Sequence, residues 1–461
     1  MIHKMGVKVN KRESAAAKTE IFESRPVPAA IAALAIPTIL SQIITMIYNL
    51  ADTFFVGHTG DPAQVAALTL VFPVYMLLTG VGNLFGIGAN SKISRCLGLG
   101  DREGASRTCV FAFWGGLAAT VLILLVLGLR LDPILRMMGA SDDSIGPTRG
   151  YITWVMLVGG LPTEASLLLA HMLRGEGSTK SASAGMMLGG ILNMILDPIF
   201  IFLFDMGVAG AGFATMLSNL SCLVFYLIVI FRNRRDTVLT LRPALFRLRG
   251  SGEVLLVGFP AAMVIALGST ANILLTRSLA AYGDIAVAAY GVTQKFGSIT
   301  MNIAIGLTQG IMPLIGYNYA SGDHARVKKV CRCSFLILFV FIALFVGTYQ
   351  AIPSPLMRLF VSDSATVALG TSFLRRWSFC IPGMTFCFLF NSIFQAMGKW
   401  QRSTILSVLR QGVIFIPAML IMGKLFGMYG LIWSQPLADL TALCIGILFY
   451  LRVRKSLQGT A

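Results

Sequence analysis

Charged side chains are scarce in this sequence. Only 12% of the 461 residues are Asp, Glu, Lys or Arg, whereas 56% are hydrophobic and the mean hydropathy is +0.77. Soluble domains usually carry about 25% charged residues. This shortage argues against an ordinary soluble domain and indicates that lipid is the main solvent of the folded chain.

Sequence motifs of ATP-driven pumps and of several enzyme classes are also missing. No Walker A motif is present, which excludes direct driving by ATP. The segment SDDS (141–144) holds a single acidic pair and lacks the aspartate-rich pattern that binds magnesium diphosphate in prenyl transferases. Neither a paired-acid nor a Ser-His constellation of an intramembrane protease is evident. We therefore expect a protein that is not an enzyme and that needs no cofactor.

Acidic residues are the scarcer of the two charge signs, with 20 Asp and Glu against 37 Lys and Arg and a net charge of +17. The basic residues do not gather in one soluble segment, so no nucleic-acid partner is expected. They lie in short tracts between apolar runs, as cytoplasmic loops do under the positive-inside rule. Of the 37, 28 fall in the tracts 1–26, 91–107, 174–180, 232–249, 326–332, 399–410 and 452–455.

Twelve apolar runs are long enough to cross a membrane as helices. They cover residues 29–57, 64–90, 108–129, 150–173, 182–204, 208–231, 254–280, 285–312, 330–351, 371–396, 403–424 and 428–451. An even number of spans puts both termini on one side, and the basic tracts make that side the cytoplasm. The sequence thus predicts an all-α polytopic protein, and the compact loops favour a bacterial inner membrane.

The chain divides into two halves of six spans each. We expect an N-lobe at 27–231, a basic cytoplasmic linker at 232–253 and a C-lobe at 254–452, with a mobile cytosolic basic tail at 1–26 and a short cytosolic tail at 453–461. No cleavable signal peptide is visible in the polar, basic first 26 residues. We expect the protein to be a monomer that contacts membrane lipids.

A repeat relates the two halves at a nearly constant shift. The matched positions are Pro37 with Pro260, Gly100-Asp101 with Gly322-Asp323, Pro133 with Pro355, Pro162 with Pro382, Pro198 with Pro417, and Gly207 and Gly210 with Gly427 and Gly430. Six spans per repeat make both halves enter the membrane in the same direction. The pseudo-twofold axis is then expected along the membrane normal, an arrangement typical of transporters that work by alternating access.

Two acids stand inside predicted spans of the first half, where an ionisable group is costly and suggests function. Asp52 lies in YNLADTFFVG (48–57), and Asp197 lies in GGILNMILDPIFIF (189–202). Asn193 precedes Asp197 by four residues, so the two share a helix face. The matching positions of the second half, near Leu275 and Ile416, are apolar, which favours ion coupling in the N-lobe.

Two buried carboxylates suit the transport of H⁺ or of a small cation such as Na⁺, and the residues do not decide between the two ions. The structural alternative is that each acid caps or pairs locally, since Asp197 before Pro198 could end a helical turn.

Three further residues are weaker candidates for a central cavity. Glu164 lines the cavity, forms a structural pair or lies in a slightly displaced span. Lys295 is a counter-charge or extends to the membrane edge, and Asp439 has the same two alternatives.

At these residues the sequence resembles the MATE family of multidrug and toxic compound extrusion transporters, of bacterial type. The resemblance covers about residues 27–452. It rests on the duplication and on four segments, YNLADTFFVG (48–57), RGEGSTKSA (174–182), NMILDPIFIF (193–202) and GVAGAGFAT (207–215). It implies two six-helix lobes within the broader MOP flippase fold. It also implies an antiporter that expels amphipathic, often cationic organic compounds while H⁺ or Na⁺ enters.

The resemblance also implies an ion-coupling site in the N-lobe. Asp52 would be its carboxylate in the first span, with Tyr48 one turn earlier, and Asn193 and Asp197 would be the partners in the fifth span. Thr215 would supply a hydroxyl from the sixth span. No firm metal site follows, but Asp52, Asn193, Asp197 and Thr215 are candidate ligands for Na⁺.

Pro37 matches a proline at which the first helix bends in some members. A proline leaves one backbone carbonyl without its helical partner, which makes bending easier.

One departure from the family pattern concerns the C-lobe, because some bacterial members carry acids in the seventh and tenth spans. Here the seventh span has no acid after Glu253 and the tenth has none. The alternative function is a flippase for lipid-linked precursors, which shares the broader fold.

Overall fold

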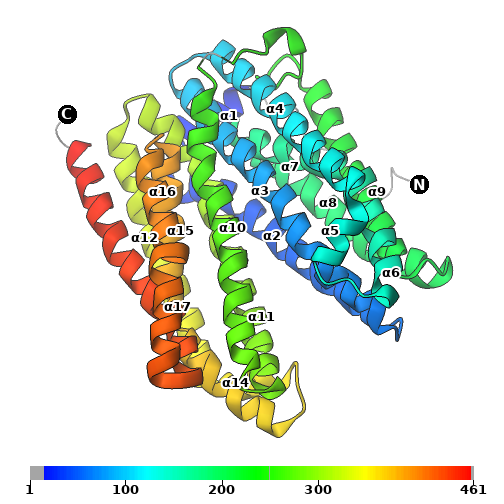
Figure 1. Cartoon of the computed structure of the whole chain (residues 1–461). Coiled ribbons are helices and arrows are strands. Elements are labelled where there is room, and N and C mark those ends of the chain that lie inside the picture. Colours follow the sequence, from blue (N-terminus) through cyan, green and yellow to red (C-terminus); the bar gives the residue numbers. More distant parts are fainter. Residues whose placement is uncertain (1–14, 249, 458–461) are drawn as a thin grey trace.

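The computed structural model describes residues 15–248 and 250–457, and within them the chain forms helices and no strand. Two lobes stand side by side, with α2 to α9 in one and α10 to α17 in the other (Figure 1). Helices are the expected solution for apolar spans, because every backbone polar group then finds its partner within the segment. Our predicted fold class is confirmed.

The N-lobe contains ten of these elements. They are α2 (Val27–Gly57), α3 (Pro62–Gly98), α4 (Arg102–Leu129), α5 (Leu131–Met137), α6 (Asp142–Ile152), the π-helical η2 (Thr153–Val158), α7 (Gly160–Gly175), α8 (Thr179–Pro198), the π-helical η3 (Ile199–Leu203) and α9 (Gly207–Arg232). A short helix, α1 (Ala15–Glu23), precedes the lobe, and η4 (Pro243–Leu245) lies between the lobes.

The C-lobe repeats much of this order. Its elements are α10 (Gly252–Ala280), α11 (Asp284–Ala320), α12 (His324–Ala351), α13 (Pro353–Arg358), α14 (Ser364–Trp377), α15 (Cys380–Ala396), α16 (Trp400–Val408), the π-helical η5 (Leu409–Ile414) and α17 (Phe415–Ser456).

The described helices account for twelve spans. Nine are individually long and apolar enough to cross a membrane, and two bent pairs each form one more. The pairs are Asp142–Val158 with Gly160–Gly175, bent by 48°, and Ser364–Trp377 with Cys380–Ala396, bent by 45°. The longest of the nine, Trp400–Ser456, breaks at Gly427, where φ is 60° and ψ is −142°. Divided there, it supplies two spans, which brings the total to twelve.

The predicted repeat is visible in matching local structure. Gly100 and Gly322 both adopt positive φ, at 75° and 85°, and the aspartates that follow them cap α4 and α12 through backbone N–H groups at 2.8 Å. Gly207 and Gly427 likewise both have positive φ, at 56° and 60°. Only glycine adopts this conformation without strain, so the paired glycines mark the same turn in each half. The short helices α5 and α13 also correspond.

The lobes contact each other along one half of their length. Gly88 and Gly258 bring α3 and α10 together, since a Cβ on either would collide with backbone of the other helix. Gly306 and Gly310 do the same for α11 against α2, where Cβ atoms would lie 2.7 Å from the Cα atoms of Ile39 and Ala35. Small residues permit such close packing of membrane helices.

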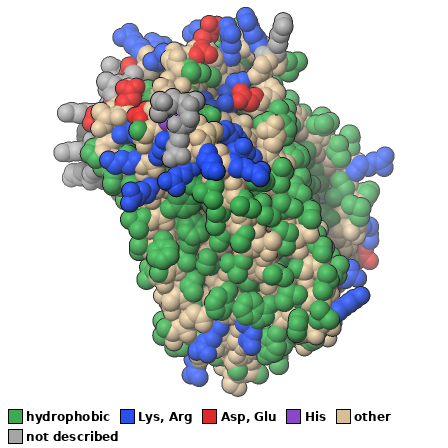
Figure 2. Space-filling view, turned by 90° about the vertical axis from the view of Figure 1, so that its left-hand side faces the viewer, with side chains coloured by type: hydrophobic (Ala, Val, Ile, Leu, Met, Phe, Trp, Pro, Cys, Tyr) green, Lys and Arg blue, Asp and Glu red, His purple; other side chains and the backbone are tan. Residues whose placement is uncertain are grey.

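The contacting half ends where the basic tracts lie, and we call this the basic end. Arg95 of α3 donates to Glu253 of α10 across the lobes at 2.6 Å. Figure 2 shows Lys and Arg gathered at this end above an apolar belt with few charges. Figure 1 shows the lobes diverging toward the opposite end. The lobes are therefore in contact at the basic end, and we call the opposite end, toward which their helices diverge, the open end.

The segment before α2 does not behave as the predicted mobile tail over residues 15–25. Phe22 of α1 is 2% exposed and stacks on Tyr317 with ring centroids 4.7 Å apart. Arg326 donates to the Phe22 carbonyl at 2.6 Å. A Cβ on Gly177 of the other lobe would contact the Phe22 ring at 2.8 Å. Apolar burial against both lobes thus orders α1, a contact that polarity alone did not reveal.

The remaining boundary predictions concern the linker and the tails. The segment between α9 and α10 carries η4, and Glu176 accepts hydrogen bonds from Thr237 at 2.7 Å and Val238 at 3.1 Å. The predicted short tail at 453–461 begins inside α17, which continues to Ser456. Residues 1–14 and 458–461 of the two predicted tails lie outside the described residues.

Candidate functional site

A cavity of about 460 Å³ lies between the lobes. Side chains from α2, α3, α7, α8 and α9 form one wall, and side chains from α10, α11 and α15 form the other. Uncharged polar residues recur on both walls: Gln42, Thr45, Asn49, Thr79, Asn83, Asn219, Asn302, Thr308, Gln309, Asn391 and Gln395. They alternate with Met, Ile, Leu and Phe side chains, so the cavity offers apolar surface with scattered hydrogen-bonding groups.

Ionisable groups are distributed unequally over this lining. Apart from Tyr and Cys, the ionisable lining residues of the described chain are Glu164, His171 and Arg174, and all three come from α7. They are spaced by seven and three residues, which places them along one face of that helix. The C-lobe wall contributes no ionisable side chain. The ionisable side chains of the cavity, Tyr and Cys apart, therefore all lie on the N-lobe side.

Asn193, Asp197 and Thr215 form one hydrogen-bonded group in the N-lobe. The Asn193 side-chain amide donates to Asp197 at 3.1 Å and to the Thr215 hydroxyl at 3.3 Å. Asp197 is fully buried and Asn193 is 2% exposed. One oxygen of each, Asp197 Oδ2 and Asn193 Oδ1, is buried without a hydrogen-bond partner among the described residues. These oxygens are free to accept a proton or a cation.

Asp52 reaches the same region from α2. Its carboxylate is partly buried, Oδ1 has no partner among the described residues, and it interacts electrostatically with Asp197. Gly190 of α8 makes this approach possible, because a Cβ there would lie 2.7 Å from Ile44 and 3.2 Å from Tyr48. Tyr48 lines the cavity one turn before Asp52. The five residues predicted for the ion-coupling site thus converge in one part of the N-lobe.

The donor set of this group is carboxylate, amide, hydroxyl and phenol oxygen. Such hard oxygen ligands suit Na⁺, and carboxylates also suit H⁺. The described residues contain no cluster of three or more His, Cys, Asp or Glu side chains that could hold a transition metal.

Glu164 lines the cavity but its carboxylate lies in a separate, apolar niche. The side chain is fully buried, and both carboxylate oxygens lack a hydrogen-bond partner among the described residues. A Cβ on Gly82 of α3 would lie 3.0 Å from Oε2, and one on Gly116 of α4 would lie 3.4 Å from Oε1. Leu167 and Leu168 contact the same two glycines. The niche exists because neither glycine has a side chain.

Arg174 is a lining residue that the sequence did not single out. It was counted with the cytoplasmic tract 174–180, yet it is 1% exposed in the last turn of α7 and donates to Met186 Sδ at 2.7 Å. Its Nε has no partner among the described residues. The available signal was its place directly after the apolar run 150–173 and ahead of Gly175, where α7 ends.

Asp439 is placed in the C-lobe core and not on the cavity wall. It is fully buried, Arg410 Nε donates to it, and Gln435 donates at 2.9 Å. The Arg410 guanidinium also stands 5.2 Å from the centroid of the Phe388 ring. Arg410 was assigned to the cytoplasmic tract 399–410, but η5 carries it into the lobe, where it is 5% exposed.

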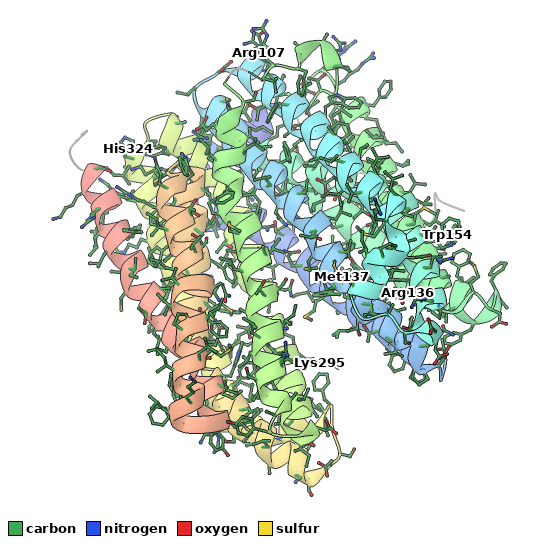
Figure 3. The ribbon with its side chains drawn as sticks, in the orientation of Figure 1. Arg107, Arg136, Met137, Trp154, Lys295 and His324 are labelled. Atoms are coloured by element: carbon green, nitrogen blue, oxygen red, sulfur yellow. The ribbon has the colours of Figure 1, made fainter. Side chains whose placement is uncertain are left out.

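Lys295 belongs to α11 near the open end of the molecule (Figure 3). Its side chain is exposed and does not line the cavity. The ammonium stands 5.2 Å from the centroid of the Phe360 ring. Both alternatives for Lys295, a counter-charge or a side chain that extends to the membrane edge, stay predictions.

Pro37 is the predicted bend position, and α2 continues through it as one helix from Val27 to Gly57. Proline has no N–H to donate, so the carbonyl of Ala33 lacks its regular helical partner. The residues on either side of Pro37 pack against Gly306 and Gly310 of α11. Pro37 therefore separates the part of α2 that closes the basic end from the part that carries Asp52.

A family model described as MatE matches residues 37–199 and 260–440, which takes in most of both lobes. Two curated relatives extend the match to nearly the whole chain. The multidrug export protein MepA of Staphylococcus saprophyticus is 31% identical over 437 residues, covering 93% of this chain and 95% of that protein. MepA of Staphylococcus aureus is 32% identical over 433 residues, with the same coverage of both chains.

A solved structure supports the same arrangement in space. It is described as the outward-facing conformation of a multidrug resistance MATE family transporter of the MOP superfamily. It superposes with a TM-score of 0.87 at 25% sequence identity and covers 95% of this chain and 98% of that one.

Proposed function

The chain belongs to the MatE family of membrane transporters, and from this premise we propose that it is a cation-coupled antiporter exporting amphipathic, often cationic organic compounds. Its curated relatives named above are multidrug export proteins. Neither of them is named as a flippase, so a role in moving lipid-linked precursors is not favoured.

The cavity supports this substrate class. Its volume of about 460 Å³ lies in the range of small-molecule sites, about 300–1,000 Å³. Methionine and other apolar side chains beside amides form an adaptable surface, which suits substrates of varied shape.

The observation that carries the coupling proposal is the incomplete hydrogen bonding of two interacting N-lobe acids. Asp52 and Asp197 interact electrostatically, and each has a buried oxygen without a hydrogen-bond partner among the described residues. Two interacting carboxylates inside a protein do not both remain charged at low cost. Binding of H⁺ or Na⁺, with Asn193, Thr215 and Tyr48 as neighbours, relieves that cost.

We propose that the basic end faces the cytoplasm of a bacterial inner membrane, with both termini on that side, as the positive-inside rule requires. The conformation described above is then outward-open. Substrate leaves the cavity from this state while a cation binds at Asp52 and Asp197. Closure of the outer end and parting of the lobes at Gly88, Gly258 and their neighbours would complete alternating access, with α2 bending at Pro37.

The proposed transport unit is one chain surrounded by lipid, with small organic molecules and the coupling cation as its ligands. No cofactor is needed, because the energy for export comes from the cation gradient across the membrane.

Ethidium efflux from proteoliposomes tests the proposal, with H⁺ and Na⁺ gradients imposed separately. We expect wild type to export ethidium under one of them and both Asp52→Asn and Asp197→Asn to fail. Asp143→Asn is the matched control, because Asp143 is an exposed acid near the open end. Normal efflux by both core variants contradicts the coupling site, and a wild type that moves no dye under either gradient contradicts the antiporter.

A further inference from the structure

The carboxylate of Glu164 has no evident role in the coupling group built from Asp52 and Asp197. It projects from α7 into the niche between Gly82 of α3 and Gly116 of α4. It is fully buried, and neither oxygen has a hydrogen-bond partner among the described residues. A buried, charged carboxylate without a partner costs several kcal/mol or more, so the neutral form is the one compatible with this niche.

The niche does not suit a metal cation as the neutralising partner. Na⁺ needs several oxygen ligands, whereas the carboxylate oxygens lie beside Gly82 and Gly116, and no group of the described residues forms a hydrogen bond with either of them. A proton needs only the carboxylate itself. This contrasts with Asp197, which has amide and hydroxyl oxygens within reach.

The titratable groups around Glu164 offer no permanent counter-charge. Tyr75 of α3 interacts with it electrostatically and is itself an acid. His171 and Arg174 share the α7 face but lie two and nearly three helical turns away, about 10 and 15 Å along the axis. The Arg174 guanidinium is directed to Met186 of α8. Glu164 is therefore neutralised by its own proton and not by an ion pair.

We propose that Glu164 is a second proton carrier, holding one proton on its carboxyl group in this outward-open state and releasing it to water on the cytoplasmic side after the lobes exchange conformation. The inference rests on the proposed antiport function. An acid that stayed protonated would need hydrogen-bond partners for its O–H group and its carbonyl oxygen. A buried carboxyl group without such partners destabilises the folded protein. Release of the proton once in each transport cycle explains why an acid occupies the niche.

The local backbone supplies a means of opening the niche. Glu164 stands four residues after Gly160, where α7 begins, and the π-helical η2 ends at Val158 just before it. The axis bends by 48° between these segments. π-Helical turns inside helices often mark functional positions, and a bend of this size gives α7 a hinge near Gly159. Rotation about this hinge would withdraw the carboxyl group from Gly82 and Gly116 toward the cavity.

Infrared spectroscopy of the purified transporter in nanodiscs tests the bound proton directly. We expect a carbonyl band of a protonated carboxylic acid at neutral pH that is absent from Glu164→Gln. The band should persist in Asp52→Asn/Asp197→Asn, which lacks the proposed coupling site. If wild type and Glu164→Gln gave the same spectrum in the region of this carbonyl band, Glu164 would be ionised and the proposal would be wrong. The assay requires no transport, so its result is independent of the antiport function.

The steady ethidium gradient sustained by proteoliposomes tests whether the proton is carried. Each coupled proton multiplies the attainable concentration ratio by ten per pH unit, because about 1.4 kcal/mol corresponds to a factor of ten. We expect Glu164→Gln to sustain a ratio roughly tenfold lower than wild type at a pH difference of one unit. Glu103→Gln, an exposed acid on α4, should match wild type.

Two further outcomes would overturn the proposal. A Glu164→Gln protein that loses the band but sustains the wild-type ratio would make Glu164 a fixed neutral acid. A wild type that sustains no ethidium gradient would remove the antiport function and this inference with it. Glu164→Asp, which keeps an ionisable group, should restore the wild-type ratio at a lower rate and guards against a folding defect in the glutamine variant.

Discussion

The two lobes treat their buried acids in opposite ways. In the N-lobe, Asp52, Asp197 and Glu164 each have a buried oxygen without a partner among the described residues. In the C-lobe, Asp439 accepts from Arg410 and from Gln435. The Arg410 guanidinium thus supplies the positive charge beside Asp439, whereas no cation of the protein pairs with the three N-lobe acids among the described residues.

This difference indicates how a protein with two duplicated lobes can keep the carboxylates that are available to a cation in one lobe only. The turns, bends and short helices occur twice because both lobes must fold and move. Among the described residues, acids with an unpaired buried oxygen occur in the N-lobe alone, and Asp439, the fully buried acid of the C-lobe, is neutralised by Arg410. The lack of acids in α10 after Glu253, and in α14 and α15, points the same way.

The strongest test of this contrast compares stability after matched Asp→Asn changes. Asp439→Asn leaves the Arg410 guanidinium buried without its counter-charge, so the free energy of unfolding should fall by about 3–5 kcal/mol. Asp197→Asn should change it by less than about 1 kcal/mol, because no cation of the protein depends on Asp197 and Asn193 can still donate to the new amide oxygen. Denaturant unfolding in mixed micelles measures both. Equal losses would contradict the contrast.

Removal of both charges from the C-lobe should restore most of that loss. In Arg410→Met/Asp439→Leu neither partner remains buried alone, and such replacements are often neutral or stabilising by about 1–4 kcal/mol. A double-mutant cycle in the same micelles measures the coupling between the two sites. Ethidium efflux of the double variant should stay coupled to the same cation, and a change of coupling ion would assign ion chemistry to the C-lobe.

Pro37→Ala should raise the stability of the protein and lower its efflux rate. The new N–H group can donate to the carbonyl of Ala33, so the variant should be more stable, by less than the ~3 kcal/mol that an interior proline costs an exposed helix. Because bending of α2 becomes harder, the efflux rate should fall several-fold while ethidium affinity stays. Pro260→Ala on α10 is the matched C-lobe control, and an equal loss of rate there would remove the special role of Pro37.

Lys295→Gln should have the smallest effect. The exposed ammonium contributes about 0.5–1 kcal/mol through its contact with the Phe360 ring and pairs with no carboxylate among the described residues. Thermal unfolding should change little, and the sustained ethidium gradient should match wild type. A loss of coupling in this variant would place a functional charge in the C-lobe and weaken the contrast.

Much of the architecture could be predicted because its signals are local. Hydrophobic length defined the spans, and Gly100-Asp101 with Gly322-Asp323 marked equivalent turns because positive φ and helix capping need those residue types at that spacing. The four-residue spacing of Asn193 and Asp197 on one helix predicted their contact for the same reason. The 15–25 segment failed as a mobile tail because its burial depends on Phe22 meeting Tyr317 and Gly177, which are distant in sequence.

The sequence by itself determined the membrane class, the twelve spans, the duplication and the acids worth attention, since each follows from composition or from spacing along one helix. Only the tertiary structure decided which charges are paired. Whether Arg410 reaches Asp439 depends on the rotation and approach of separate helices, and so does the niche that Gly82 and Gly116 leave around Glu164. Apolar length carries no information about that rotation, so the state of each buried charge is a property of the packed lobes.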